Sequence, residues 1–152
     1  MRFETLPSQK NRNFVVNYCN TDRSLDSKPA QTSVGYAFSF NEVQLELSET
    51  GLANHVWGYC PKESWQATNA EPPQATPGEL RVVPDSPFVP GVTIGASKTR
   101  LPVFYNEHSR WLCIGNPSAS GGFQIKLAPG LIVVGELSLM IALWVQVNQF
   151  DS

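Results

Sequence analysis

Hydrophobic and polar residues alternate along much of the chain, which is the pattern of β-strands that bury one face. One face of residues 33–40 is apolar and carries Val34, Tyr36, Phe38 and Phe40. The apolar positions change parity after Asn41 and Glu42. This change predicts a tight turn or a β-bulge between two strands.

Further short apolar runs predict strands near residues 13–19, 55–60, 79–83, 92–94, 101–105, 111–114 and 123–127. Twelve prolines and eleven glycines lie mostly between these runs, as in proteins built from many short strands and structured turns. Residues 62–78 are rich in Ala, Thr, Gln and Pro and are expected to form a long surface loop, while Pro129 and Gly130 predict a turn.

The apolar segment at residues 131–147 approaches the length of a membrane span. However, Glu136 and Gln146 interrupt it, and from Leu137 onward the large apolar residues recur at every second position. This period predicts one long strand rather than a membrane anchor, and no membrane partner is expected.

The even positions of this expected strand are also apolar in its middle, notably at Met140 and Trp144. A strand that is apolar on both faces needs a cover on its second face. We therefore predict that Met140 and Trp144 contribute to a subunit interface; the alternative is that the 61–78 loop folds over Trp144.

A chain of 152 residues, 41% of them hydrophobic, can bury the core of one domain. We expect an all-β protein with a polar N-terminal arm at residues 1–31, which contains one short strand, and a single antiparallel β-sandwich at residues 32–152. An eight-stranded jelly roll fits the strand pattern, although an immunoglobulin-like sandwich gives a similar one.

The formal net charge of −2 gives no general attraction to nucleic acid, so RNA contacts would have to be local. Within residues 1–28 five cations face three carboxylates. The predicted RNA-contacting cations are Arg2, Lys10, Arg12, Arg23 and Lys28. Lys98, Arg100 and Arg110 form a second, weaker basic group.

Catalytic and metal-binding signatures are not found in the sequence. Cys19, Cys60 and Cys113 lack a C-x-x-C pair and are interpreted as buried thiols, and His55 and His108 have no partner at ligand spacing. We therefore predict no enzyme activity and no cofactor. Two alternatives stay open: a Cys113–His pair formed through space, and a calcium ion shared between subunits.

Exposed aromatic residues would point to a different function. Trp57, Tyr59 and Trp65 fall on or beside expected strands, where rings on an open face could stack on sugars. A carbohydrate-binding, lectin-like β-sandwich is the alternative function.

The C-terminal forty residues carry a resemblance to a known family. Gly135, the polar Glu136 and the alternating apolar run that follows resemble the closing strand of jelly-roll coat proteins from small icosahedral RNA viruses, and the chain length resembles that of satellite-virus coat proteins. The resemblance implies a capsid protein that assembles with copies of itself around RNA, in the host cytoplasm and then in the virion. The chain departs from this family in lacking a strongly basic N-terminal arm.

Overall fold

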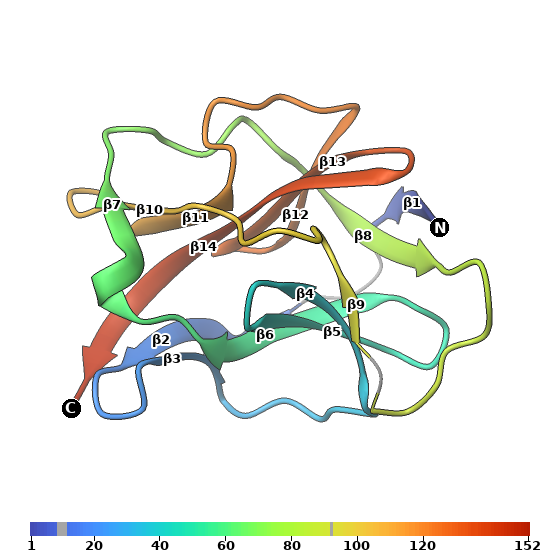
Figure 1. Ribbon diagram of the computed structural model, residues 1–152, viewed down its shortest axis with the longest axis horizontal. Helices are drawn as coiled ribbons and strands as arrows, with labels where there is room; N and C mark the ends of the chain where they lie inside the picture. Colours follow the sequence, from blue (N-terminus) through green and yellow to red (C-terminus); the bar gives the residue numbers. More distant parts are fainter. Residues whose placement is uncertain (9–11, 92) are drawn as a thin grey trace.

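The computed structural model describes residues 1–8, 12–91 and 93–152 (Figure 1). Strands and one short 3₁₀-helix, η1, make up the secondary structure of these residues. In chain order they are β1 (Arg2–Pro7), β2 (Val15–Cys19), β3 (Ser24–Lys28), β4 (Tyr36–Phe40), β5 (Val43–Leu47), β6 (Ala53–Tyr59), η1 (Lys62–Ser64), β7 (Trp65–Ala67), β8 (Thr76–Val83), β9 (Thr93–Gly95), β10 (Val103–Asn106), β11 (Trp111–Gly115), β12 (Phe123–Ala128), β13 (Leu131–Glu136) and β14 (Leu139–Asp151).

The strands form one curled sheet, and the long strand β14 connects its two parts. In its first half β14 pairs antiparallel with β13 and with β11, and the pairing with β13 extends to Leu131 opposite Val145. In its second half β14 pairs parallel with β2, from Val147 opposite Val16 onward. On the β13 side of β14 the strand order is β13-β12-β8-β1. On the β2 side the order is β2-β3-β6-β5-β4-β9.

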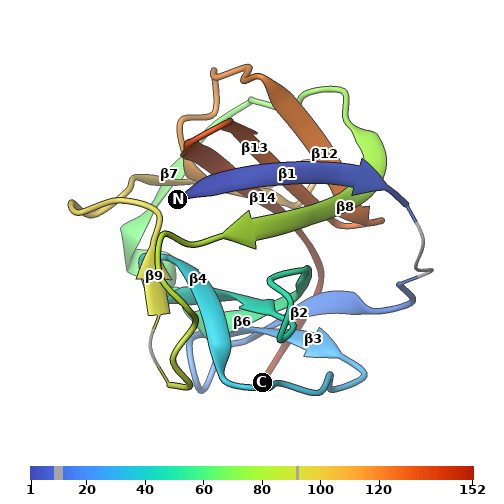
Figure 2. The ribbon, with the colours of Figure 1, turned by 90° about the vertical axis from the view of Figure 1, so that its right-hand side faces the viewer.

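Figure 2 shows the strands β1, β8, β12 and β13 above, and β2, β3, β4, β6 and β9 below. The main hydrophobic core lies between these two parts of the sheet. It is made of fully buried side chains from both, including Leu25, Phe40, Leu45, Leu80 and Leu143. This burial explains why one face of most strands is apolar in sequence.

The all-β class is confirmed, and the turn at Asn41 and Glu42 and the long C-terminal strand are both present. The sheet is not wholly antiparallel, contrary to expectation, because β7 with β10, β8 with β12, β2 with β14 and β4 with β9 are parallel pairs. Alternation in sequence sets which face of a strand is buried but carries no information on the direction of its neighbour.

The N-terminal segment differs from the expected polar arm with one short strand. The described part of residues 1–31 supplies three strands, and β1 extends the sheet by pairing with β8 from Arg2 opposite Val83 to Pro7 opposite Gly78. The side chain of Phe3 is buried in the main core and contacts the Phe38 ring at 5.5 Å between centroids. One buried phenylalanine therefore anchors a strand whose other residues are mostly polar.

Met140 and Trp144, predicted to lie at a subunit interface, are placed differently by the structure. Both side chains are buried within the chain itself, Met140 in the main core and Trp144 in a second, smaller cluster on the other face of β14. Ala70 and Ala75 pack against that second cluster. The 61–78 segment, the alternative cover, thus contributes to burying this cluster together with Phe104, Trp111 and Ile141. This segment also contains η1 and β7.

Candidate functional site

Two large aromatic side chains stand on the outer face of β6. Trp57 is 46% exposed and Tyr59 is 44% exposed, whereas the intervening Gly58 is buried. Residues two apart on a strand point to the same side and are separated by about 7 Å. The two rings therefore form adjoining parts of one open surface, which we call the β6 aromatic face.

Polar side chains from the neighbouring strands flank these rings. Asp26 of β3 and Gln44 of β5 are the direct partners of Trp57, and Ser24 of β3 is the partner of Tyr59. Directly paired residues share a face of the sheet, so their side chains lie beside the aromatic ones. Thr93 of β9 extends this polar border, with its hydroxyl 3.4 Å from Gln44 Oε1.

Trp57 is held in place by a buried carboxylate. Its indole Nε1 donates a hydrogen bond to Glu46 Oε1 of the adjacent strand β5, at 2.5 Å. The Glu46 side chain is only 4% exposed. A hydrogen bond to an ionised acceptor is roughly twice as strong as one between neutral groups. The indole is therefore anchored across the sheet rather than free to rotate.

His55 lies two residues before Trp57 on β6 and is also buried. Burial lowers the pKa of His55, and the nearby Glu46 carboxylate opposes this with a smaller effect. His55 Nδ1 and Glu46 Oε2 are buried atoms without a hydrogen-bond partner among the described residues. Two polar side chains of a kind that is uncommon in a protein interior thus lie beside the β6 aromatic face, since His55 shares the parity of Trp57 and Glu46 bonds its indole.

Gly58 allows the close packing beneath the two rings. Its φ of +143° is a conformation that favours glycine, and a Cβ at this position would overlap the carbonyl oxygen of Glu42. The glycine between Trp57 and Tyr59 therefore lets the β4–β5 turn lie directly against β6.

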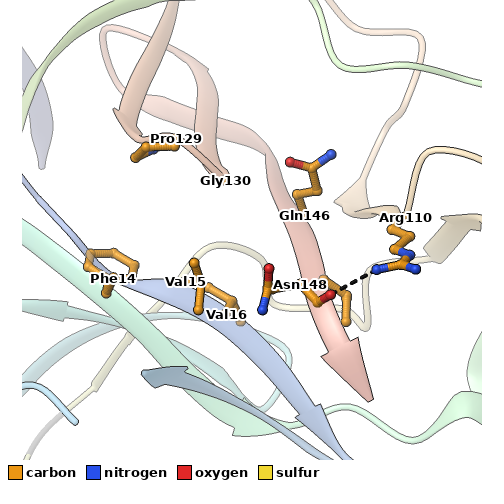
Figure 3. Close-up of a pocket in the computed structure, with 9 residues that line it drawn as sticks. Phe14, Val15, Val16, Arg110, Pro129, Gly130, Gln146 and Asn148 are labelled. Atoms are coloured by element: carbon orange, nitrogen blue, oxygen red, sulfur yellow. Dashed lines mark hydrogen bonds between the residues drawn. The ribbon is translucent and has the colours of Figure 1, made fainter. Parts of the chain in front are cut away.

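A groove crosses β14 where this strand exchanges β13 for β2 (Figure 3). Its volume is about 280 Å³. Figure 3 shows Arg110 on one side of β14 and the Phe14, Val15 and Pro129 side chains on the other. Gln146 and Asn148 lie between them on β14. The groove is separate from the β6 aromatic face, since it shares no lining residue with it.

The cations predicted to contact RNA lie on different elements, and three of them meet carboxylates. Arg12 makes two hydrogen bonds, of 2.7 and 2.8 Å, to Glu79 in a buried ion pair. Arg2 lies 3.3 Å from Glu4, and Arg23 lies 3.5 Å from Glu63. The side chain of Lys28 is exposed at the end of β3, and Lys10 lies outside the described residues.

Arg12 is therefore a structural residue rather than a free cation. Its guanidinium also donates to the carbonyl oxygen of Ala53 at 2.8 Å, which connects the start of the chain to β6 and β8. This role could not be predicted from neighbouring residues, because its partner Glu79 is 67 positions away.

Trp65, the third candidate aromatic, belongs to a different group from Trp57 and Tyr59. It is half-buried, its ring meets that of Tyr18 edge-on at 5.1 Å, and its Nε1 lies 3.4 Å from the Cys60 sulfur. Lys62 lies 4.5 Å from the centroid of Phe150 at the edge of this group. These contacts make Trp65 a packing residue.

The cysteine thiols in the interior are not activated. Burial raises the pKa of Cys113 to about 12 and that of Cys60 to about 11. Both remain protonated at neutral pH, whereas a nucleophilic cysteine needs its thiolate. Among the residues that the structure describes, no three or more His, Cys, Asp or Glu side chains gather as a metal site would require. A calcium ion shared between subunits stays a prediction.

Comparison of the chain with protein-family models, curated proteins and solved structures found no match. Within the described ranges, no helix has the length and apolar character needed to cross a bilayer. The function of the chain is therefore inferred from the geometry of its surface.

Proposed function

We propose that this chain is a carbohydrate-binding module whose ligand stacks on the β6 aromatic face. The observation that carries the proposal is the pair of exposed rings, Trp57 and Tyr59, side by side on an otherwise polar sheet surface. The C–H groups of a pyranose ring pack against the electron-rich face of an aromatic side chain. Two rings about 7 Å apart on a strand can contact adjoining parts of one oligosaccharide.

The polar border supports the same class of ligand. Asp26, Gln44 and Thr93 offer hydrogen-bond donors and acceptors beside the rings, which is what sugar hydroxyls require. The hydrogen bond from Trp57 to Glu46 fixes the indole before a ligand arrives. Binding then loses less side-chain entropy than it would with a mobile ring.

The carboxylates near Trp57 also limit the kinds of glycan that can bind. Asp26 flanks Trp57 and Glu46 accepts a hydrogen bond at the edge of its indole, so the electrostatic potential at the rings favours neutral sugars over glycans that carry carboxylate or sulfate groups. We therefore assign neutral oligosaccharides as the ligand class.

A glycan array followed by calorimetric titration of the strongest ligand tests this proposal. Trp57→Ala and Tyr59→Ala are each expected to weaken binding about fivefold or more, since a stacked ring contributes on the order of 1–3 kcal/mol. Leu139→Ala, which removes an exposed apolar side chain from β14, serves as the matched control and leaves binding unchanged. An array without hits, or binding that survives loss of both rings, would refute the proposal.

A jelly-roll coat protein that encloses RNA is the second candidate. It is favoured by the hairpin between β13 and β14, whose Leu137 is 71% exposed and Leu139 54% exposed, because apolar tips of this kind bury well against another subunit. Size-exclusion chromatography with light scattering, read at 260 and 280 nm, separates the two candidates. A megadalton particle containing nucleic acid would support the shell, and a small species free of nucleic acid would count against it.

A further inference from the structure

The groove across β14 arises from the way this strand changes partners. Gln146 lies between Val145, the last residue paired with β13, and Val147, the first residue paired with β2. At this point the β12–β13 turn at Pro129 and Gly130 diverges from the start of β2. The space between them stays open, and the side chains of Gln146 and Asn148 lie within it (Figure 3).

The two ends of the groove differ in chemistry. Phe14, Val15, Val16 and Pro129 make one end apolar, with Val15 45% exposed. The other end carries the guanidinium of Arg110. Arg110 is the one charged side chain that lines the groove within the described part of the chain, so no carboxylate lining it offsets this cation.

The polar end is fixed in position by the protein. Arg110 Nη1 donates to the backbone oxygen of Asn148 at 2.8 Å, and Gln146 Nε2 donates to the backbone oxygen of Ser109 at 3.2 Å. A guanidinium has five N–H donors in a planar fork, so this anchoring bond leaves others for a ligand. Such a fork matches the two oxygens of a carboxylate.

We propose that this groove is a second binding site, independent of the β6 aromatic face, for a small carboxylate with an apolar body. Its carboxylate pairs with Arg110, and its apolar body crosses β14 to contact Phe14, Val15 and Pro129. A volume of about 280 Å³ restricts the ligand to a small molecule, because pockets for drug-sized molecules begin at roughly 300 Å³.

Three probes that differ only in their head group test the proposal: 4-phenylbutyrate, 4-phenylbutan-1-ol and 4-phenylbutylamine. Each is titrated into the ¹⁵N-labelled full chain and followed by amide chemical shifts. The carboxylate is expected to shift the signals of Val15, Gly130, Gln146 and Asn148, and to bind at least tenfold more tightly than the alcohol or the amine. Equal binding of all three, or shifts outside the groove, would overturn the proposal.

A pair of matched variants isolates the guanidinium. Arg110 and Arg23 both end a turn with a positive φ, of 65° and 56°, which is a conformation that favours glycine. Arg110→Gly therefore removes the cation while keeping the backbone, and it is expected to weaken 4-phenylbutyrate binding at least tenfold. Arg23→Gly makes the same change away from the groove and leaves binding intact.

If Arg110→Gly fails to fold, Arg110→Gln provides the same test. Full binding by a folded Arg110 variant would overturn the role of the guanidinium. Because the β6 aromatic face contributes no residue to this groove, loss of glycan binding in Trp57→Ala and loss of phenylbutyrate binding in Arg110→Gly are separate outcomes.

Discussion

Trp144 and Trp57 both lie on a strand face that points away from the main core, but one is buried and the other is exposed. Trp144 on β14 is 1% exposed in the cluster against which Ala70 and Ala75 of the 61–78 segment pack, and its Nε1 has no hydrogen-bond partner among the described residues. Trp57 on β6 is open to solvent, and its Nε1 is bonded to Glu46. The covered tryptophan is positioned by packing, and the bare one by a hydrogen bond.

This difference indicates that Trp144 contributes to stability and that Trp57 is available for binding. A tryptophan that is packed on all sides contributes through the apolar area it removes from water, so its contacts serve the fold. A tryptophan that is fixed at its edge but exposed on its ring contributes less to the fold and keeps its ring available to a ligand. Substitutions on the two faces should therefore have separable effects.

The largest effect is expected from Trp144→Ala. It should lower the free energy of unfolding by about 3–5 kcal/mol, because it leaves a cavity that the sheet cannot close. Urea denaturation followed by circular dichroism measures this loss. Trp144→Phe removes the unpartnered nitrogen and keeps most of the packing, so a loss as large as that of alanine would contradict the packing explanation.

Thiol labelling tests how well the cluster around Trp144 is protected from solvent. Cys113 lies directly opposite Trp144 and is fully buried, whereas Cys19 is partly exposed. Because burial raises the pKa of Cys113 to about 12 and that of Cys60 to about 11, both should react with a disulfide reagent at least ~100-fold more slowly than Cys19. Rapid labelling of Cys113 in the native protein would mean that the 61–78 segment opens readily.

A smaller effect should come from His55, the buried residue beside the exposed face of β6. Its lowered pKa means that, below about pH 6.5, the unfolded chain binds a proton that the folded chain takes up less readily. Stability should therefore fall as the pH drops from 7 to 5. His55→Gln should reduce this fall, as measured by urea denaturation at the two pH values, and unchanged pH dependence would contradict it. The exposed His108→Gln is the matched control.

The smallest effect on stability is expected from Tyr59→Ala. Removing this exposed ring should change the free energy of unfolding by about 0.5 kcal/mol, within the range of surface substitutions. The same urea denaturation measures it. A loss approaching that of Trp144→Ala would mean that the aromatic face is part of the core, and the comparison of the two tryptophans would fail.

The sequence predicted the features that depend on neighbouring residues. The parity change at Asn41 and Glu42 located the β4–β5 turn, and the period-two pattern from Leu137 located β14. Both are local because side chains on a strand alternate between its faces. The exposed aromatic pair was also among the candidates, since Trp57 and Tyr59 share the parity of one face.

Features that depend on distant residues were not predictable. The parallel pairing of β14 with β2 joins residues about 130 positions apart, and the ion pair of Arg12 with Glu79 crosses 67 positions. Nothing in a short window of sequence encodes such a partner. For the same reason the pattern showed that both faces of β14 were apolar but not that the chain itself would cover Trp144.

Because β14 pairs with strands of both halves of the sheet, the sheet can be completed only late in synthesis. This strand pairs with β11, β13 and β2, and it follows every other described strand in the chain. During synthesis, the strand that pairs with both halves of the sheet becomes available only when residues 139–151 leave the ribosome. Closing the sheet is therefore a late step that depends on contacts distant in sequence, which slow folding. The nascent chain spends that interval with the edge of β2 unpaired, a state in which chaperones or a neighbouring copy can bind it.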